Sequence, residues 1–589
     1  MTTPANDARY PRPVPRVGDT SSARDRREQP DGWAMGESVT AALSNVVAGR
    51  RDIRRFRPDP VPEELVEAVL LAGHQGPSVG HSQPWRFIVV RSPETRDKAA
   101  HLADRARLAQ AEHLTSDRAN RLLDLKLEGL REAPVGIVVA CDRRTSALGV
   151  LGRATFPDAD LWSCACAIEN MWLTARAHGL GMGWVTLFDP AELGGLLHLP
   201  QGVVTLGWLC LGWPDERPPS PGLERAAWSS RRPLDEVVLQ ERWPAEGEEP
   251  APPESHLRAP SQERLVAATD SADEVLAPPE SLGVLDRAVS RIEAIGAGGV
   301  AGGTLVLAAA DHPVADLGVS AYAVSVTRDV TLAALAGTSQ GASAARAAQL
   351  ACVVVDAGVL GGPLDEAEDT RPRDRRGDLV AEDGLTAFDV DSLLVRGREI
   401  GSAAAQSGLV ALGEIGVGNT TVGAALACAL TGLEPRDAVG LGAGSDSAIL
   451  DRKREVVTAA LERARPSLDA AVTPGERALV SLRALGGPEI AVLTGVVLGA
   501  VEAGAPIVLD GLAGSLPGLL ATMIEPGVQA HLFAGQVSRE RAHAAVLREL
   551  GLEPLLSLRL RAGEGVGAVL ASSLLLQGLA IRRTVARTR

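Results

Sequence analysis

Arginines are concentrated in one short stretch of the sequence, RRDIRRF, at residues 50–56. Four of its seven residues are arginine, and a guanidinium group can bind a phosphate through two parallel N–H bonds. Asp52 stands between them and would place a carboxylate beside any phosphate-bearing molecule bound there. The stretch therefore predicts a phosphate site, and an exposed basic turn is the alternative.

A second stretch, GPSVGHSQPWRFIVV (76–90), ends in an apolar run typical of a strand. Ser78, Gly80 and Gln83 supply small and hydrogen-bonding groups in the loop before that run. Backbone and amide groups of such a loop can meet the edge of a planar heterocycle. A plain entry into a strand is the alternative interpretation.

Two glycine-rich loops occur in the second half of the chain. GEIGVGNTT (413–421) follows an apolar run and opens a helix, where backbone N–H groups and two Thr hydroxyls would face a phosphate. GLGAGSDSAILDRKR (440–454) leads into a helix that contains Lys453, the only lysine of this half. The other lysines are Lys98 and Lys126, so Lys453 indicates a point charge for a phosphate, with chance retention as the alternative.

GEGVGA (563–568) places Glu564 between two glycines at the start of a predicted helix. One interpretation is an acid that caps the helix and is stabilised by its dipole. The other is a general base in a tight pocket, which flat aromatic molecules can approach because the flanking residues lack side chains.

The distribution of tryptophan indicates where the chain divides into domains. These domains must position the candidate site residues described above. All nine tryptophans lie between Trp33 and Trp243, which places a boundary near residue 243. Residues 244–273 are rich in Pro, Glu and Ser, which predicts an extended linker, and residues 1–36 predict a disordered tail. We expect two domains, 37–243 and 274–589, because single cores stop growing at roughly 250 to 300 residues.

The two halves differ in the order of their strand-like and helix-like runs. In the first domain the runs 85–90, 135–141, 181–187 and 203–213 are separated by amphipathic segments, which predicts an α+β fold with a central helix over 158–179. The second domain alternates helices with short apolar runs at 303–311, 351–358, 409–416, 505–511 and 528–535. Such alternation predicts an α/β fold with a doubly wound parallel sheet, whose ligand lies beyond the carboxyl ends of the strands.

Composition excludes several classes of function. A net charge of −15, without a basic stretch interleaved with aromatic residues beyond the N-terminal tail, argues against nucleic-acid and anionic-membrane partners. The apolar stretch 566–581 contains Ser, Gly and Gln, and we expect it to fall short of a membrane span. The six cysteines show no repeated CxxC, so we expect no disulfide framework and no metal site, and a reducing cytoplasm.

Residues 46–238 resemble the nitroreductase-like flavoproteins and, within them, the BluB-type dimethylbenzimidazole synthases. The resemblance rests on RRDIRRF (50–56), PSVGHSQPWRF (77–87), LKLEGLREAPVGIVVACDR (125–143), LGRATFPDADLWSCACAIENMWLTARAHGLGMGWV (151–185) and SSRRPL (229–234). LEGLREAP and LGRATFPDADLWS are particular to the synthase branch, whereas the Arg-rich and Gln-Pro-Trp elements are shared with ordinary nitroreductases.

This resemblance implies roles for individual residues. The FMN phosphate would be bound by Arg50, Arg51, Arg54 and Arg232. The flavin ring would be contacted by Ser78 and Gln83, with Gly183 in the segment 181–184 beside its N5 face. Asp52 stands where the synthases have a functional aspartate, and it would accept protons during ring fragmentation. Thr186 replaces a serine of the family, so the hydroxyl is kept and a methyl group is added.

The implied reaction consumes reduced FMN with O₂ and yields dimethylbenzimidazole and a four-carbon sugar phosphate. FMN is then a substrate, and we expect an external flavin reductase to supply it in reduced form.

Residues 275–585 resemble the CobT-type phosphoribosyltransferases. Besides GEIGVGNTT and GEGVGA, the shared motifs are PPESLGVLD (278–286), AAADH (308–312), GVSAY (318–322), DAGV (356–359), PIVLDG (506–511) and LRAGEGVGA (560–568). The resemblance implies that Glu564 takes the proton of the benzimidazole as its nitrogen attacks the ribose of nicotinate mononucleotide. The phosphate would be bound by Gly418, Asn419, Thr420, Thr421, Gly442, Gly444 and Lys453. Glu414 would lie near the ribose, Ser320 and Tyr322 near the base, and no metal is needed.

Four motifs of this chain depart from the second pattern. The chain has Pro313 after His312, Ala323-Val324 after GVSAY, Thr338-Ser339 in place of Gly-Ala, and Val528 in place of a histidine. Because the phosphate elements persist, we expect altered or weakened binding of the base rather than loss of activity.

Two other interpretations remain open at this point. The first is an NAD(P)H-dependent nitroreductase or flavin reductase, with FMN left intact, fused to a nucleotide-binding domain. The second is a C-terminal half that binds ligands without transferring a group. Both resembled families work as homodimers, so we expect a homodimer.

Overall fold

The structure, a computed structural model, describes residues 10, 17–18, 20–115, 118–119, 122, 129–226, 228–243, 256–257, 259–278, 280–440, 442 and 446–588. Its chain separates into two compact units. The first unit is Trp33–Glu248, and the second unit combines Met1–Gly32 with Glu249–Arg589. Each has its own sheet and its own hydrophobic core, as a chain of this length requires.

The first unit contains a four-stranded antiparallel sheet with the order β1-β2-β4-β3. Its strands are β1 (Trp85–Val90), β2 (Val135–Asp142), β3 (Gly181–Val185) and β4 (Val203–Gly212). All four lie in the predicted apolar runs, and the predicted α+β fold is confirmed.

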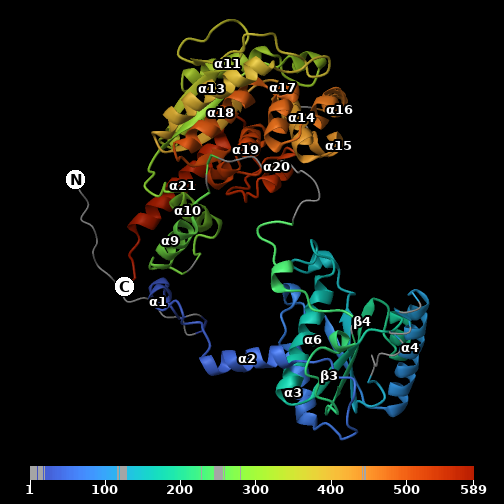
Figure 1. The fold of residues 1–589 in the computed structure, drawn as a ribbon. Coiled ribbons are helices and arrows are strands. Elements are labelled where there is room, and N and C mark those ends of the chain that lie inside the picture. The colour runs from blue at the N-terminus through green and yellow to red at the C-terminus, as the bar shows by residue number, and fades with distance from the viewer. Residues whose placement is uncertain are drawn as a thin grey trace. The chain divides into compact units, whose positions relative to one another are not determined.

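Helices pack against both faces of this sheet. Side chains alternate between the faces of a strand, and in β2 Ile137 and Val139 join one core while Val138 joins the other. The first core contains residues of α3 (Glu63–His74) and α6 (Ala159–Ala177), and the second contains residues of α4 (Pro93–Glu112), on the opposite side of the sheet in Figure 1. The other helices are α2 (Glu37–Gly49), η1 (Val79–His81), η2 (Ala147–Gly149), α7 (Pro190–Leu196), α8 (Gly222–Arg225) and η3 (Leu234–Glu236).

The second unit contains a six-stranded parallel sheet with the order β10-β9-β8-β5-β6-β7. Its strands are β5 (Gly303–Ala309), β6 (Ala351–Asp356), β7 (Glu368–Asp369), β8 (Leu409–Ile415), β9 (Ile507–Leu509) and β10 (Leu532–Ala534). β6 and β8 lie on opposite sides of β5, so the order of the chain reverses there, as in a doubly wound fold. The predicted parallel sheet is confirmed, and only the two-residue β7 was not predicted.

Helices also cover both faces of the second sheet. In β5, Val306 and Ala308 join a core with α13 and α18, whereas Leu305 and Leu307 join a core with α10, α12 and α21. The helices after residue 256 are α9 (Gln262–Asp273), α10 (Val284–Ala294), η4 (Pro313–Leu317), α11 (Ser325–Leu335), α12 (Gln340–Ala347), α13 (Ala387–Ala405), α14 (Asn419–Thr431), α15 (Pro435–Ala438), α16 (Ser447–Asp469), α17 (Pro474–Leu485), α18 (Pro488–Glu502), α19 (Leu512–Ile524), η5 (Pro526–His531), α20 (His543–Glu549) and α21 (Val566–Thr584).

Two segments predicted to be irregular contain helices. α1 (Ala23–Glu28) lies within the predicted disordered tail, and α9 lies within the predicted linker 244–273. α1 begins with a capping box, in which Ser22 Oγ accepts from Asp25 N at 3.1 Å and Asp25 Oδ2 accepts from Ser22 N at 2.7 Å. The predictions of a disordered tail and of an extended linker do not hold for these residues. Charged side chains weaken the apolar periodicity by which a helix is predicted from sequence.

α21 differs from the expectation for 566–581. Within the described ranges it is the one helix long and apolar enough to cross a membrane, judged by length and composition alone. In the structure 56% of that stretch is buried inside the protein, and the helix contacts β8, β9, α10 and α12. This placement is typical of the core helix of a globular domain.

Candidate functional site

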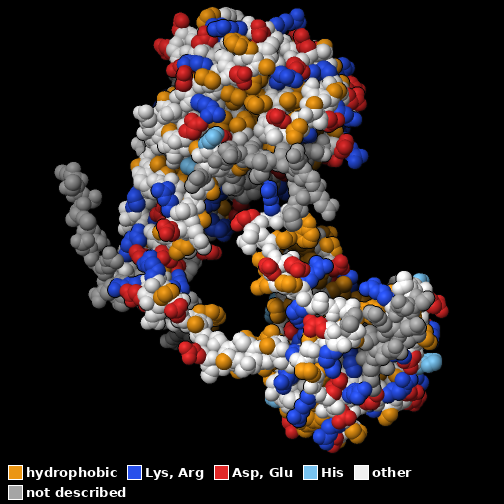
Figure 2. All heavy atoms as spheres, viewed as in Figure 1, with side chains coloured by type: hydrophobic (Ala, Val, Ile, Leu, Met, Phe, Trp, Pro, Cys, Tyr) orange, Lys and Arg blue, Asp and Glu red, His pale blue; other side chains and the backbone are white. Residues whose placement is uncertain are grey.

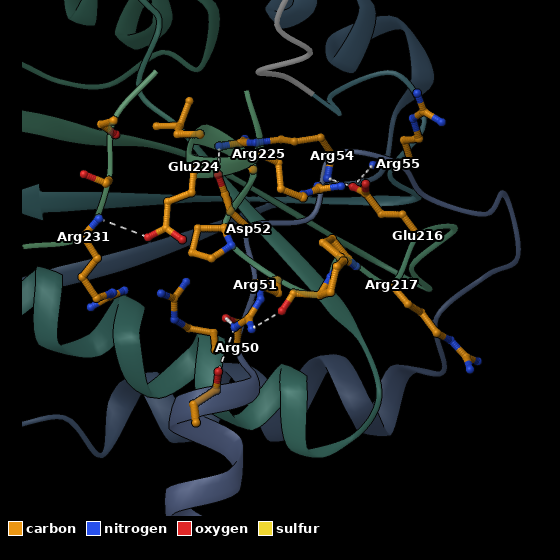
Figure 3. Close-up of a pocket in the computed structure, with 18 of the residues that line it drawn as sticks. Arg50, Arg51, Asp52, Arg54, Arg55, Glu216, Arg217, Glu224, Arg225 and Arg231 are labelled. Atoms are coloured by element: carbon orange, nitrogen blue, oxygen red, sulfur yellow. Dashed lines mark hydrogen bonds and ion pairs between the residues drawn. The ribbon is translucent and has the colours of Figure 1, made fainter. Parts of the chain in front are cut away.

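Seven arginines line a cavity of about 1300 Å³ in the first unit, which Figure 3 shows in close-up. Four come from the predicted stretch, Arg50, Arg51, Arg54 and Arg55. The other three are Arg217, Arg225 and Arg231. Three carboxylates share the lining, Asp52, Glu216 and Glu224. In a chain with a net charge of −15, this is the local positive charge that an anionic ligand needs.

Strand β3 holds the RRDIRRF stretch in place. Asp52 and Met182 form a parallel bridge, and Ile53 N donates to Met182 O at 3.0 Å. A Cβ atom on Gly183 would lie 2.2 Å from Ile53 O, so only glycine allows this approach. The predicted site residues Asp52 and Gly183 therefore lie side by side.

Side chains complete this junction. Trp184 N donates to Asp52 Oδ1 at 3.2 Å, and Arg54 Nη2 donates to Trp184 O at 2.9 Å and to Asp52 Oδ2. Glu216 Oε1 accepts from Arg54 N at 2.7 Å and from Arg55 N at 3.1 Å. Glu216 thus holds the backbone of the stretch at Arg54 and Arg55 through one carboxylate oxygen, as the dashed lines in Figure 3 show.

Two donors in this lining lack partners. Arg51 Nε and Arg54 Nη1 are buried without a hydrogen bond within the described part of the chain. Leaving a buried donor unsatisfied costs about 1–3 kcal/mol, and an anionic oxygen in the cavity would remove that cost. Arg50 stacks on Trp172 with its Cζ atom 4.5 Å from the ring centroid. These residues fit the phosphate of a flavin mononucleotide.

The surroundings of Asp52 have opposing effects on its acidity. Desolvation raises the pKa of Asp52 above its ordinary value, whereas the charge of Arg54 and the Trp184 N–H lower it. The side chain remains 41% exposed, so solvent limits this rise. Asp52 can therefore exchange protons with a ligand in the cavity.

Five predicted residues of the first domain do not line the cavity, and Gly183 is one of them, although it lies beside Asp52. Ser78 and Gln83 lie in a separate turn, where Gln83 N donates to Ser78 Oγ at 3.1 Å, and Thr186 is exposed after β3. Arg232 is exposed, and its neighbour Arg231 lines the cavity in its place. Within one chain, the structure thus separates Ser78 and Gln83, two of the predicted ring contacts, from the predicted phosphate contacts, whereas Gly183 lies beside them.

The segment LGRATFPDADLWS (151–163), named above as particular to the synthase branch, has a structural role that its sequence did not reveal. Arg153 Nη2 pairs with Asp160 Oδ2 at 2.7 Å, and both side chains are buried. Arg143 Nε pairs with the same Asp160 oxygen at 2.9 Å. A Cβ atom on Gly80 would lie 2.9 Å from Leu151 O, so this segment packs directly on the Ser78 turn.

Besides Arg231, sequence reasoning missed five charged lining residues, Arg55, Glu216, Arg217, Glu224 and Arg225. Arg55 was part of the quoted motif, and the run ERPPSPGLER (216–225) was the available signal for the other four. Its charged residues frame a proline-rich turn, and Arg51 Nη2 donates to Pro219 O at 3.0 Å.

In the second unit, Glu564 stands at the start of α21 in a left-handed conformation with φ of 58°. Its Oε2 accepts from Gly341 N at 2.9 Å, and its N donates to Glu414 O at 3.2 Å. A Cβ atom on Gly341 would lie 2.2 Å from Glu564 O. The turn is therefore held between the end of β8 and the first turn of α12.

Glu414 is the second carboxylate of this site. Burial is the main cause that raises the pKa of Glu414 to about 8, and the charges of Glu489, Asp510 and Glu564 raise it further. Asn419 Nδ2 donates to Glu414 Oε2 and opposes the rise. Glu414 is thus largely protonated at neutral pH.

The start of α14 connects this carboxylate to the predicted phosphate residues. Asn419 Oδ1 accepts from Thr420 N at 2.7 Å, and Lys453 Nζ donates to Thr420 Oγ1 at 3.1 Å. Burial lowers the pKa of Lys453, and the Glu540 charge opposes that effect. A Cβ atom on Gly442 would lie 2.7 Å from Lys453 Nζ. The structure therefore brings together predicted residues from two loops.

The remaining predicted residues of this site are less closely joined. Gly418 begins α14 with φ of 98°, and Thr421 is buried with an Oγ1 that has no partner among the described residues. Ser320 Oγ accepts from Tyr322 N at 3.1 Å, and Tyr322 is 51% exposed. Gly444 lies outside the described residues.

Two departures from the family pattern have clear structural roles. Ser339 caps α12, because its Oγ accepts from Ala342 N at 3.3 Å, and α12 supplies the Gly341 contact to Glu564. Pro313 occupies the first turn of η4. Beside it, His312 Nε2 lies 3.3 Å from the buried Glu489 Oε1.

Residues 47–213 match the Nitroreductase family, and residues 257–589 match the family described as Phosphoribosyltransferase. The first half is 44% identical over 196 residues to a 5,6-dimethylbenzimidazole synthase of Rhodospirillum rubrum, covering 33% of this chain and 93% of that protein.

The second half is 40% identical over 311 residues to a nicotinate-nucleotide–dimethylbenzimidazole phosphoribosyltransferase of Thermus thermophilus, covering 51% of this chain and 90% of that protein. The crystal structure of CobT from Thermus thermophilus superposes with a TM-score of 0.51 and 38% identity, covering 55% of this chain and 97% of that one. Each half is thus similar to nearly the whole length of a separate protein.

Proposed function

Since the chain belongs to the 5,6-dimethylbenzimidazole synthases in its first unit and to the nicotinate-nucleotide–dimethylbenzimidazole phosphoribosyltransferases in its second, we propose that it makes dimethylbenzimidazole and then converts it to a nucleotide. The product would be α-ribazole 5′-phosphate, a precursor of the lower ligand of cobalamin. Both family matches and both site geometries support this assignment.

In the first unit, reduced FMN is the substrate and O₂ the oxidant. Arg50, Arg51 and Arg54 bind its phosphate, with Arg231 in the position expected of Arg232. Asp52 accepts protons as the ring fragments, because it is the carboxylate joined to β3 at the edge of the cavity. A separate flavin reductase supplies the reduced flavin.

In the second unit, nicotinate mononucleotide is the phosphoribosyl donor. A benzimidazole nitrogen forms the bond to C1′ of the ribose, and the bond to nicotinate breaks with its electron pair leaving on the pyridine ring. Glu564 takes the proton from the other benzimidazole nitrogen. Lys453 and Thr420 bind the phosphate, and protonated Glu414 donates a hydrogen bond near the ribose.

A homodimer explains why Ser78 and Gln83 lie outside the cavity of their own chain. We assign them to the flavin ring of a second copy. In support, α2 has no buried residue within the described chain, and Val39, Leu43 and Val47 are exposed on it at helical spacing. A partner protomer would cover this apolar stripe.

We place the enzyme in the cytoplasm. All six cysteines lie in the described part of the chain, and all six are free thiols, two of them exposed. A reducing compartment keeps such thiols reduced.

One connected path of hydrogen bonds leads from the assigned base to the phosphate residues, and this observation supports the proposal most. The path passes through Glu564, Glu414, Asn419, Thr420 and Lys453. The test is to incubate the purified chain with reduced FMN, O₂ and nicotinate mononucleotide and to measure α-ribazole phosphate by mass spectrometry. Formation of the product is the expected outcome.

Two controls separate the halves. Omission of O₂ should stop product formation, and added dimethylbenzimidazole should restore it. If FMN is recovered intact while NAD(P)H is oxidised, the first unit is a reductase. If nicotinate is not released in the presence of added dimethylbenzimidazole, the second unit is not a transferase.

A further inference from the structure

The N-terminal helix α1 lies on the second unit rather than on the first, to which it is adjacent in sequence. Three ion pairs join it to the end of α9. Arg26 Nη2 lies 2.8 Å from Asp273 Oδ2, Arg27 Nη1 lies 2.7 Å from Asp270 Oδ2, and Arg27 Nη2 lies 3.4 Å from Glu274 Oε1. Figure 2 shows Lys and Arg side chains interspersed with Asp and Glu side chains over α1 and α9.

Burial distinguishes this contact from an ordinary surface pairing. Asp270 is 8% exposed and Ala23, on α1, is 2% exposed. An exposed ion pair contributes only about 0.2–1 kcal/mol. A partly buried pair beside a buried alanine is less screened by solvent and excludes competing partners better.

The two ends of the chain meet at the same place. Tyr10 and Thr588 form a parallel bridge, and Tyr10 N donates to Arg587 O at 3.4 Å. Thr588 N donates to Glu274 O at 2.8 Å, and Arg587 Nη1 lies 3.3 Å from Glu274 Oε2. Residue 274 therefore contacts both the C-terminal segment and α1.

We propose that Tyr10 and residues 20–28 form a clasp on the second unit. The first unit is then an insertion in the chain of the second unit, and both of its ends are held there. The first unit then has two attachments to the second, one covalent through residues 244–255 and one noncovalent through the clasp. A second attachment raises the effective concentration of one unit near the other without any contact between their sites. The proposal stands independently of the activities assigned to the units.

The test uses the full chain with a protease site inserted after Pro250, between the units. After cleavage, the fragments of the otherwise unaltered chain should elute together in size-exclusion chromatography at an ionic strength of about 0.1 M. At about 1 M, where the Debye length falls from about 10 Å to about 3 Å, the association should weaken.

Variants identify the contacts responsible. The double variant Arg26→Glu, Arg27→Glu should weaken fragment association at least tenfold. Arg24→Glu is the matched control, because Arg24 lies on the same helix and pairs with Glu28 at 2.7 Å within it. Adding Asp270→Arg and Asp273→Arg to the double variant should restore association through reversed charges.

Two results would overturn the proposal. One is separation of the cleaved but otherwise unaltered chain at low ionic strength. The other is association of the cleaved double variant as tight as that of the Arg24→Glu control. An unchanged melting temperature of the second unit in the double variant would show that its effect is on association and not on folding.

Discussion

The two carboxylates assigned to catalysis, Asp52 and Glu564, have contrasting surroundings. Asp52 is paired with Arg54 and remains 41% exposed. Glu564 has φ of 58° and is held by Gly341 N and Glu414 O. A non-glycine residue in the left-handed region costs about 1–3 kcal/mol and is typical of functional sites. Each carboxylate can be tested by an isosteric change to the amide, which keeps the shape of the side chain and removes its charge and its basicity.

We predict that Asp52→Asn retains FMN binding and loses dimethylbenzimidazole formation. The amide preserves the acceptor for Trp184 N but cannot take up a proton at neutral pH. Flavin binding is measured by fluorescence quenching and benzimidazole yield by chromatography. The same variant supplied with dimethylbenzimidazole should make α-ribazole phosphate at the unaltered rate. An undiminished benzimidazole yield would remove Asp52 from the mechanism.

Glu564→Gln is expected to lower nicotinate release by about 10²–10⁴-fold, the usual contribution of a general base. The glutamine oxygen can still accept from Gly341 N, so binding of both substrates should change little. Single-turnover release of nicotinate measures the chemical step. Release at the unaltered rate would show that Glu564 has only a structural role at the start of the helix. Glu414 would then become the next candidate for the general base.

For Lys453→Ala we expect a rise in KM for nicotinate mononucleotide that exceeds the fall in kcat. A phosphate contact is present in both the ground state and the transition state, so its loss weakens binding in both. Steady-state kinetics with saturating dimethylbenzimidazole provide the measurement. Because Lys453 also bonds Thr420, a Thr420→Val variant should shift KM in the same direction. An unchanged KM would assign the lysine a structural role.

Individual residues could be predicted from sequence where a motif positions them within its own chain segment. Arg50 and Asp52 are such residues and line one cavity, and Glu564 stands at the start of a helix as expected, while their functional roles stay predictions. The arginine that lines the cavity is Arg231, one residue before the predicted Arg232. The segment is irregular, so no periodicity in its sequence indicates which side chain faces the cavity. Ser78 and Gln83 could not be placed, since one chain does not contain their proposed ligand.

At the scale of elements, the pairing of β3 with the RRDIRRF stretch determines the shape of the cavity. We predict that Gly183→Ala disrupts this pairing, because the added methyl group would meet Ile53 O at 2.2 Å. Overpacking of this kind costs about 1–3 kcal/mol. FMN affinity should fall and the melting temperature of the first unit should drop.

Gly195→Ala is the matched control for this change. Gly195 belongs to α7 of the same unit, and a Cβ atom there would meet nothing within 4 Å. Alanine favours a helix over glycine by about 1 kcal/mol, so this variant should be neutral or slightly more stable. Equal FMN affinity in both variants would show that the pairing does not shape the cavity.

The central strands β2 and β5 were predictable because burial on both faces makes them apolar over nearly their whole length. The parallel direction of the second sheet followed from the alternation of its strands with helices, whereas the order of the strands was not predicted. α1 and α9 were not predictable, because their stability depends on charged contacts between segments 247 residues apart, such as Arg26 with Asp273. No local pattern reports such a pairing.

At the scale of the whole molecule, buried carboxyl groups make stability depend on pH. Burial raises the pKa of Glu414 to about 8 and that of Asp510 to about 6, from 4.5 and 3.8. Between the ordinary pKa and the raised pKa of each group, the folded state binds more protons than the unfolded state. The free energy of unfolding therefore falls as pH rises through that range. We predict that the second unit loses stability from about pH 3.8, where Asp510 begins to contribute, to about pH 8.

Glu414→Gln should flatten this decline, chiefly above about pH 6, where Asp510 no longer contributes to the slope. Thermal unfolding of the second unit, followed at several pH values, measures the effect. The exposed Glu434→Gln change is the control and should leave the slope unaltered. A variant with the same slope as the parent protein would show that Glu414 ionises normally.

The clasp also sets an order of events during synthesis of the chain. Arg26 leaves the ribosome long before Asp273, which lies 247 residues later. At roughly 5–20 residues per second, the arginines wait about 12–50 s for their partners. The first unit can fold during that interval as an independent domain. Closure of the loop therefore follows folding of the first unit, because it needs Asp270, Asp273 and Glu274.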